Sequence, residues 1–302
     1  MSLPGPAAGA TAPARDPDVA ALLPEARRTI RRVARTFALA SRLLPREIRE
    51  DTELLYLVLR TLDDLVDLEG AHDPVAESRL AAVEAWAAGT TPAVSGVAGA
   101  TPETRILDDL VRRHPALPRD AVTDFMAGMR QDLDGPRMET EADVDLYCYR
   151  VAGTVGRLMA SILGATGDDA DRAARALGAA MQRTNILRDV DEDLARGRVY
   201  LAEATLRAHG LDRATLATGD RTGVLRDGIA RADGAYRTGM AGIRLLPHGR
   251  RSIRAAAVMY REILRQIERD GLGVRRPWRS VVPRWRKAII VLRAVIVPAG
   301  PD

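Results

Sequence analysis

The sequence contains few aromatic residues and a single cysteine. Phe, Trp and Tyr together make up 4% of its 302 residues. Because aromatic and β-branched side chains are enriched in strands, their scarcity beside abundant Ala, Leu and Arg favours helices. One cysteine, Cys148, excludes a disulfide within the chain and is typical of a reducing compartment. We therefore expect a helical, cytoplasmic protein.

Long hydrophobic runs and concentrated charge are also missing. The first 18 residues lack the basic start and apolar core of a signal peptide. The longest late apolar run, residues 288–297, is about half a membrane span and contains Arg293, so it allows peripheral contact with a membrane at most. The net charge of +4 is spread along the chain. This charge suits an anionic substrate or an acidic membrane surface, and it does not indicate nucleic acid.

No polar linker divides the chain. Its length alone would allow about two domains. The N-terminal residues are rich in Pro, Ala and Gly, which is typical of disorder. We predict a disordered arm at residues 1–18, one domain at 19–297 and a short tail at 298–302.

Apolar residues recur at helical spacing through most of the sequence. No strand pattern persists, so we predict an all-α bundle. Gly153 and Gly156 interrupt one apolar helix, where small residues permit either close helix packing or a kink, or line a cavity. The expected helices are residues 19–44, 53–67, 79–88, 103–113, 119–134, 143–163, 170–194, 201–209, 222–245 and 252–270.

Two pairs of aspartates stand four residues apart, Asp63 with Asp67 and Asp189 with Asp193. On a helix, each pair occupies one face. A solvated face is the ordinary explanation, but both pairs follow apolar stretches, and Asp is a poor residue for helix interiors. Four carboxylates directed inward would repel one another unless a cation neutralised them. Carboxylate oxygens and a substrate diphosphate are typical Mg²⁺ ligands, so the pairs predict a diphosphate clamp.

Each pair has polar neighbours on the same helix face. Arg60 precedes Asp63 by three residues, and its side chain suits either a phosphate or an intrahelical ion pair. Gln182 and Asn185 precede the second pair, where an amide oxygen is able to complete a metal shell. Arg188 and Arg198 are expected to contact phosphate, whereas Asp191 and Glu192 are expected to face solvent.

Several long motifs resemble those of one known family. The segments are NILRDVDEDLARGRVYL from Asn185, YCYRVAGTVGRLM from Tyr147, RTFALASRLLP from Arg35 and YLVLRTLDDLVD from Tyr56. GIRLLP and YREIL follow later in the chain. Together they resemble the squalene/phytoene synthase family, in the family's order, over roughly residues 28–270.

The resemblance implies a class I isoprenoid synthase bundle with a central apolar cavity. It also implies Mg²⁺-dependent chemistry, with Mn²⁺ as the alternative cation, on farnesyl (C15) or geranylgeranyl (C20) diphosphate. In this family two prenyl diphosphates join head to head through a cyclopropylcarbinyl diphosphate, which ionises again and rearranges. The sequence does not decide between the two chain lengths, and it leaves open whether NADPH reduces the intermediate.

The family's site residues carry over to matching positions in this sequence. The expected metal ligands, which are also the catalytic aspartates, are Asp63, Asp67, Asp189 and Asp193, with Asn185 assisting. The positions expected to bind the prenyl or diphosphate groups are Arg35, Thr36, Tyr56, Arg60, Gln182, Asn185, Arg188 and Tyr260.

Three positions depart from the family pattern. Leu59 stands where members often have Cys or Ala, and Ala202 stands where they usually have Pro. Arg150 replaces a Tyr found in many members, which puts any proton-transfer role of that Tyr in doubt. The basic segment RRPWRSVVPRWRK near the C-terminus matches the family only loosely, so no site residue is assigned there.

Two other functions fit parts of the pattern. A terpene cyclase would need the same acidic helices, but cyclases commonly line their pocket with aromatic residues that stabilise cations. Their scarcity here favours coupling over cyclisation. A noncatalytic binding or assembly protein would have broken metal motifs, and these motifs are intact. The oligomeric state is not indicated by the sequence.

Overall fold

The computed structural model describes residues 13–67, 73–90, 100–275 and 279–296. The side chains of residues 35–37, 67 and 291–296 are not among those described. Within this part of the chain every regular element is a helix, which confirms the all-α prediction. The elements are α1 (Pro17–Ala21), α2 (Leu23–Val33), α3 (Arg35–Ala40), η1 (Ser41–Leu43), α4 (Arg46–Asp67), α5 (Pro74–Ala87), α6 (Pro102–Arg113), α7 (Arg119–Leu133), α8 (Glu141–Cys148), η2 (Tyr149–Gly153), α9 (Thr154–Ile162), α10 (Asp168–Arg188), α11 (Val190–Ala195), α12 (Glu203–Ala208), α13 (Thr222–Ala241), η3 (Gly242–Leu245), α14 (Arg250–Arg269) and α15 (Arg284–Ile296).

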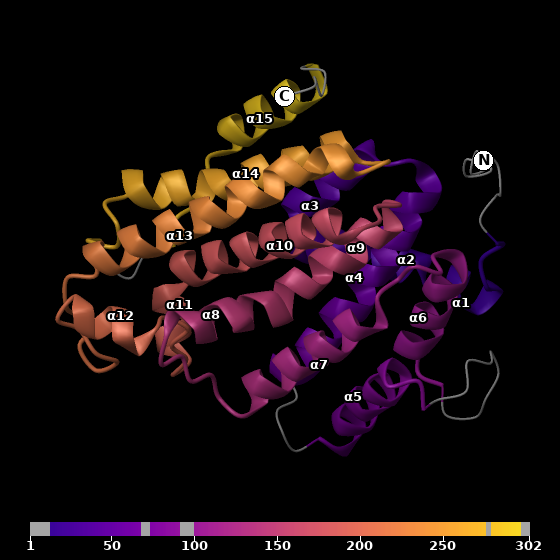
Figure 1. The fold of residues 1–302 in the computed structure, drawn as a ribbon, viewed down its shortest axis with the longest axis horizontal. Helices are drawn as coiled ribbons and strands as arrows, with labels where there is room; N and C mark the ends of the chain where they lie inside the picture. The colour runs from indigo at the N-terminus through magenta and orange to yellow at the C-terminus, as the bar shows by residue number, and fades with distance from the viewer. Residues whose placement is uncertain (1–12, 68–72, 91–99, 276–278, 297–302) are drawn as a thin grey trace, which may run out of the picture.

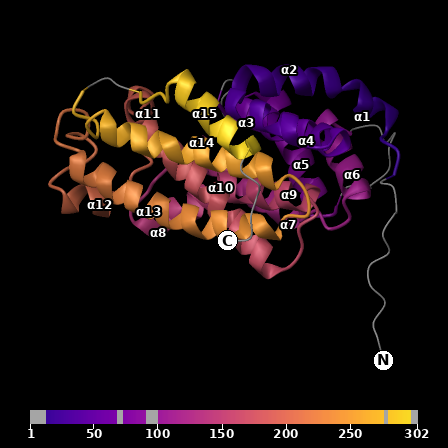
Figure 2. The ribbon, with the colours of Figure 1, turned by 90° about the horizontal axis from the view of Figure 1, so that it is seen from above.

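Helix α10 forms the axis of the bundle. It packs against α13 and α14 on one side and against α8, η2 and α9 on the other (Figure 1). Helices α4, α5, α6 and α7 form the remaining wall, and α15 lies along α14 (Figure 2). None of the described helices is both long enough and apolar enough to cross a membrane.

Glycines allow α10 to approach the η2–α9 segment very closely. A Cβ on Gly178 would overlap the Ala152 carbonyl, and a Cβ on Gly156 would overlap the Ala174 carbonyl. The chain also makes a π-helical turn over Tyr149–Gly153, which shifts the direction of the helix. The small residues of this segment therefore serve close packing, and Gly156 also borders the cavity described below.

The structure divides four of the predicted helices, one of which, at residues 222–245, consists of α13 and η3. The expected helix at residues 19–44 is four shorter elements, α1, α2, α3 and η1. Pro24 explains the first break, because proline has no N–H to donate and is tolerated only in the first turn, where it lies in α2. The π-helical turn interrupts the expected helix at 143–163, and Asp189 interrupts the expected helix at 170–194. Helix α15 was not predicted.

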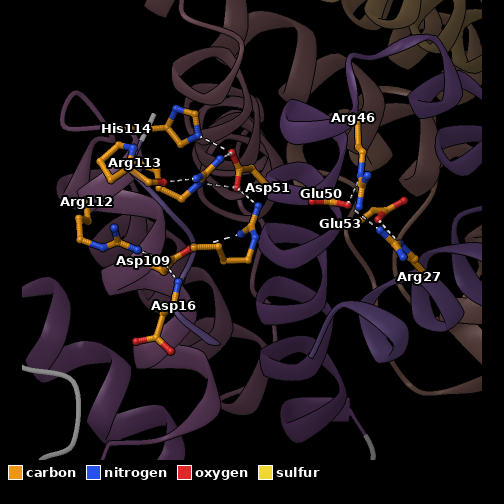
Figure 3. A network of polar contacts seen from close by, with 12 residues as sticks. Asp16, Arg27, Arg46, Glu50, Asp51, Glu53, Asp109, Arg112, Arg113 and His114 are labelled. Atoms are coloured by element: carbon orange, nitrogen blue, oxygen red, sulfur yellow. Dashed lines mark hydrogen bonds and ion pairs between the residues drawn. The ribbon is translucent and has the colours of Figure 1, made fainter. Parts of the chain in front are cut away.

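A network of buried charges holds the start of the chain against α4 and α6 (Figure 3). Arg15 Nη2 donates to Asp51 Oδ1 at 2.6 Å, and Arg15 also pairs with Asp109. Arg113 and His114 bond the same Asp51 carboxylate, which is 1% exposed. Within the predicted arm, residues 13–18 are therefore anchored, and helix begins at Pro17 rather than Val19. Residues 1–12 lie outside the described part.

We expect Asp51→Ala to destabilise the protein by about 3–5 kcal/mol, because the buried Arg113 would lose its partner. Burial alone would raise the pKa of Asp51, but hydrogen bonds from His114, Arg113 and Arg15 outweigh it and lower the pKa. The stabilisation is therefore present above the ordinary carboxyl pKa and is lost as the pH falls through the lowered value. Urea unfolding measures both effects. Asp18→Ala, which breaks an exposed pair with Arg105, should change stability little.

Candidate active site

An elongated apolar cavity of about 270 Å³ lies beside α10. Its lining residues on α10 include Ala170 and Gln182, which are twelve residues apart. At the rise of an α-helix this separation corresponds to about 18 Å. Of the described residues that line the cavity, the polar ones, Gln182, Asn185 and Tyr260, gather at one end. The other lining residues are small or aliphatic: Val151, Ala152, Val155, Gly156, Met159, Ala160, Leu163, Ala170, Ala173, Ala174, Leu177, Gly178, Met181, Gly239, Gly242, Ile243, Leu246, Ile253 and Ala256.

The second acidic motif begins where α10 ends, next to this polar end. Asp189 has φ −104° and ψ 15°, so it separates α10 from α11 instead of continuing the helix. Its carbonyl still accepts a hydrogen bond from the Asp193 N–H at 2.9 Å. The two aspartates therefore keep the one-turn spacing that the sequence predicted, although the helix between them is broken.

The Asp189 carboxylate is held by two arginines. Arg188 Nε and Nη2 donate to its two oxygens at 2.7 and 2.5 Å. Arg279 Nε donates to Oδ1 at 2.8 Å from the segment that precedes α15. The Arg188 side chain is mostly buried, so this pair lies in a medium of low dielectric constant.

Asp193 and Asn185 provide oxygen atoms suited to a cation. Burial, followed by the negative charge of Asp189, raises the pKa of Asp193 to about 7. Asn185 Nδ2 donates to Gln182 Oε1 at 3.2 Å, whereas Asn185 Oδ1 is buried and accepts no hydrogen bond. A carboxylate with a raised pKa and an amide oxygen without a partner are each the kind of hard ligand that a divalent cation satisfies. These residues therefore fit the implied metal.

The first acidic motif lies on α4. Arg60 Nη1 donates to Asp63 Oδ2 at 2.7 Å, and Arg60 also pairs with Asp64. Of the two roles considered for Arg60, the structure shows the intrahelical ion pair. The side chain of Asp67 lies outside the described ones. Among the described residues, no three Asp, Glu, His or Cys side chains are gathered as a metal-binding group.

Two tyrosines lie near the acidic motifs, and one of them, Tyr260, lines the cavity. Burial raises the pKa of Tyr56 to about 12, and the nearby charges of Arg60, Tyr260 and Asp63 also act on it. Tyr260, on α14, is itself near Arg188 and Asp189. Tyr56 is thus near the first acidic motif and Tyr260, and Tyr260 is near the second motif. Arg35 and Thr36 lie in α3, but their side chains are outside the described ones, so their assignment stays a prediction.

Two contacts in this region differ from the sequence-based expectation. Asp191 was expected to face solvent, but it forms a two-pronged ion pair with Arg221 at 2.7 and 2.8 Å, and the Arg221 side chain is 3% exposed. That prediction is wrong, because α13 begins at Thr222 and brings its preceding arginine under α11. Arg279 lies in the basic segment for which no site residue was assigned. In the sequence, only the positive charge of Arg279 could have indicated a role at this site.

Comparison with known proteins assigns the family. A model of the squalene/phytoene synthase family matches residues 30–286. The chain belongs to the squalene/phytoene synthase family. The phytoene synthase of Thermus thermophilus is 39% identical over 293 residues, which cover 95% of each chain. The 15-cis-phytoene synthase of Synechococcus elongatus is 34% identical over 90% of this chain and 93% of that one.

Solved structures agree with this assignment. The structure of a dehydrosqualene synthase in complex with a ligand superimposes with a TM-score of 0.79 at 25% identity, covering 92% of this chain and 96% of that one. This member of the squalene/phytoene synthase family is therefore a prenyltransferase with the isoprenoid synthase fold. The family match also extends past Arg279 into the first residues of α15, beyond the last of the sequence motifs described above.

Proposed function

We propose that the enzyme joins two molecules of geranylgeranyl diphosphate head to head and forms a phytoene-type C40 hydrocarbon. The observation that carries this proposal is the cavity, which extends about 18 Å from the polar end between walls of Ala, Gly and aliphatic residues. A long, flexible hydrocarbon chain fits such a space. Two of the related enzymes are named phytoene synthases, which supports the C20 substrate.

We propose that Mg²⁺, or Mn²⁺ in its place, is held by the two acidic motifs. The ligands would be Asp63, Asp67, Asp189 and Asp193, with Asn185 Oδ1 assisting. The metal, when bound, supplies a Lewis acid that stabilises the departing diphosphate.

The chain's own cations would bind the diphosphate. Arg188 and Arg279 hold the Asp189 carboxylate in this structure, and Arg60 holds Asp63 and Asp64. A planar guanidinium binds phosphate oxygens as well as carboxylate oxygens. Arg35 and Thr36 are proposed to bind the diphosphate as well.

The cavity walls would protect the reactive carbon centres from water. Loss of diphosphate leaves an allylic cation, which water would quench before the second substrate reacted. Tyr56, Gln182 and Tyr260 would hold the head groups, while the aliphatic walls align the two chains. Tyr260 is the one aromatic residue among the described residues that line the cavity. A cyclase would be expected to use more, so coupling is the better explanation.

The test is product analysis. Purified enzyme is incubated with Mg²⁺ and either geranylgeranyl or farnesyl diphosphate, each with and without NADPH, and the extract is examined by mass spectrometry. We expect a C40 hydrocarbon from the C20 substrate, independent of NADPH, because a phytoene-type product forms by proton loss. A cyclic C20 product would instead identify a cyclase, and a preference for farnesyl diphosphate would correct the chain length.

Ala170→Phe should shorten the usable chain. Ala170 lines the end of the cavity farthest from Asp189, so a larger side chain there obstructs the tail of a C20 substrate but not its head. We expect kcat/KM for geranylgeranyl diphosphate to fall about tenfold or more, with farnesyl diphosphate affected less. Ala176→Phe, on the same helix but away from the cavity, is the control. Equal losses for both substrates would contradict this account of the cavity.

We further propose that the hydrocarbon product passes into a lipid phase on the cytoplasmic side of a membrane. A C40 hydrocarbon has no polar group, and each exposed CH₂ costs about 0.8 kcal/mol in water. Release into water would therefore be slow, whereas release beside a bilayer would not.

A further inference from the structure

Large apolar side chains are exposed mainly on one face of the molecule. Among the described residues, nine large hydrophobic side chains are exposed. Six of them lie at the end of α2, on α3 and η1, and on or just before α15, all of which face the viewer in Figure 2. We name this surface the α3–α15 face; it consists of Val33, Leu39, Leu43, Val281, Trp285 and Ile289.

Helix α15 has an inner and an outer side. Trp285 and Ile289 are one turn apart and are 59% and 41% exposed. The opposite side contacts the protein: Ile290 packs against a small cluster that includes Ala40 and Met259. Ala256 in that cluster and Met181 packed against it also line the cavity. The helix therefore lies over part of the cavity wall and presents Trp285 and Ile289 outward.

The cluster beneath α15 joins the two parts of this face. Ala40 comes from α3, while Ala255, Ala256 and Met259 come from α14, which lies between α3 and α15. Leu39 and Leu43, four residues apart, are 39% and 40% exposed on the α3–η1 side. The exposed apolar residues of both parts thus belong to one surface built around α14.

The charge of the same segments has a single sign. Residues 26–46 contain seven arginines and no Asp or Glu. Residues 271–301 contain six arginines and a lysine, again without an acidic residue. Arg31, Arg32, Arg42 and Arg284 are exposed beside the apolar side chains. The rest of the chain is rich in acidic residues, so this concentration of positive charge is local.

We propose that the α3–α15 face docks on an anionic lipid bilayer. Basic residues near such a surface contribute about 1 kcal/mol each through attraction to anionic headgroups. Exposed aliphatic side chains enter the interface, and Trp is favoured at the level of the headgroups. A second copy of this chain is a poorer occupant, because a symmetric interface would bring two strongly basic surfaces together. Docking would help release of the hydrocarbon product only if the proposed function is right, but the docking proposal itself does not depend on that function.

The test measures sedimentation of the full-length protein with vesicles, without substrate. Vesicles of phosphatidylglycerol and phosphatidylcholine are compared with vesicles of phosphatidylcholine alone. We expect binding to the anionic vesicles, weakened by salt. The double variant Trp285→Ser/Ile289→Ser should bind about tenfold or more weakly. The matched control, Val75→Ser/Leu146→Ser, removes two exposed apolar side chains elsewhere and should bind as the wild type does.

Three results would overturn the proposal. The first is equal binding to both kinds of vesicle, and the second is an equal loss of vesicle binding in the double variant and its control. The third is a dimer of the wild-type protein in solution, seen by light scattering, that is absent in the double variant. Turnover in detergent is measured separately. A protein that binds vesicles but forms no C40 product would refute the proposed function and leave the docking proposal intact. A protein that forms the C40 product but does not bind vesicles would refute docking and leave the proposed function intact.

Discussion

Asp189→Asn is expected to reduce turnover of geranylgeranyl diphosphate about 10³-fold while the protein stays folded. The substitution removes a proposed ligand of the Mg²⁺ that would stabilise the departing diphosphate, and losses of this size follow removal of such electrostatic groups. It relieves the repulsion that raises the pKa of Asp193, but it also weakens the pair with the mostly buried Arg188, so we expect some loss of stability in a protein that still folds. Steady-state kcat at saturating Mg²⁺ and thermal unfolding are the measurements.

Asp191→Ala is the matched control, two residues away. Its partner Arg221 is buried, so this variant should lose about 3–5 kcal/mol of stability. Its kcat per folded molecule should stay near the wild-type value, because Asp191 faces α13 and not the cavity. If Asp189→Asn retains wild-type turnover, or if Asp191→Ala abolishes turnover in folded protein, the assignment of the second acidic motif is wrong.

Gly178→Ala is expected to destabilise the protein by about 3 kcal/mol. The added methyl group would overlap the carbonyl group of Ala152 and would approach the Cα of Gly153, which are backbone atoms of the neighbouring helical segment. Two packed backbones cannot yield as a side chain can, so the cost lies at the upper end of the range for overpacked sites. The midpoint and slope of urea unfolding measure the change.

Gly234→Ala, in α13, is the control for this variant. The added methyl group there would meet only the tip of the Arg237 side chain, at 3.7 Å. Because Ala is favoured over Gly inside a helix, we expect a gain of about 0.5–1 kcal/mol. Equal stability of the two variants would show that the close approach of α10 and η2 does not constrain the fold.

The sequence was most informative where a pattern is local. Spacing alone put Gln182, Asn185 and Asp189 on one helix face, and Gln182 and Asn185 do share the polar end of the cavity. It could not predict that Asp189 breaks the helix, because that conformation depends on how α11 packs. The first break in the expected helix at residues 19–44 had a readable signal in Pro24, whereas the second, at Ala34, had none.

Contacts between segments that are distant in the sequence could not be predicted from the sequence. Asp191 and Arg221 are thirty residues apart, and Asp189 and Arg279 are ninety apart. Nothing in either short segment specifies its partner, because these contacts follow from the way α13 and the segment before α15 return to the end of α10. The two glycines of the η2–α9 segment did indicate close packing, but only the structure identifies Gly178 as the residue opposite.

The most direct test of head-to-head coupling uses a mixture of unlabelled and deuterated geranylgeranyl diphosphate in equal amounts. Mass spectrometry of the hydrocarbon product then shows how many substrate molecules each product contains. Coupling predicts a mixed product with one labelled half, in addition to the fully labelled and unlabelled species. A product that occurs only as labelled and unlabelled C20 species would contradict the account, because each product would then derive from a single substrate.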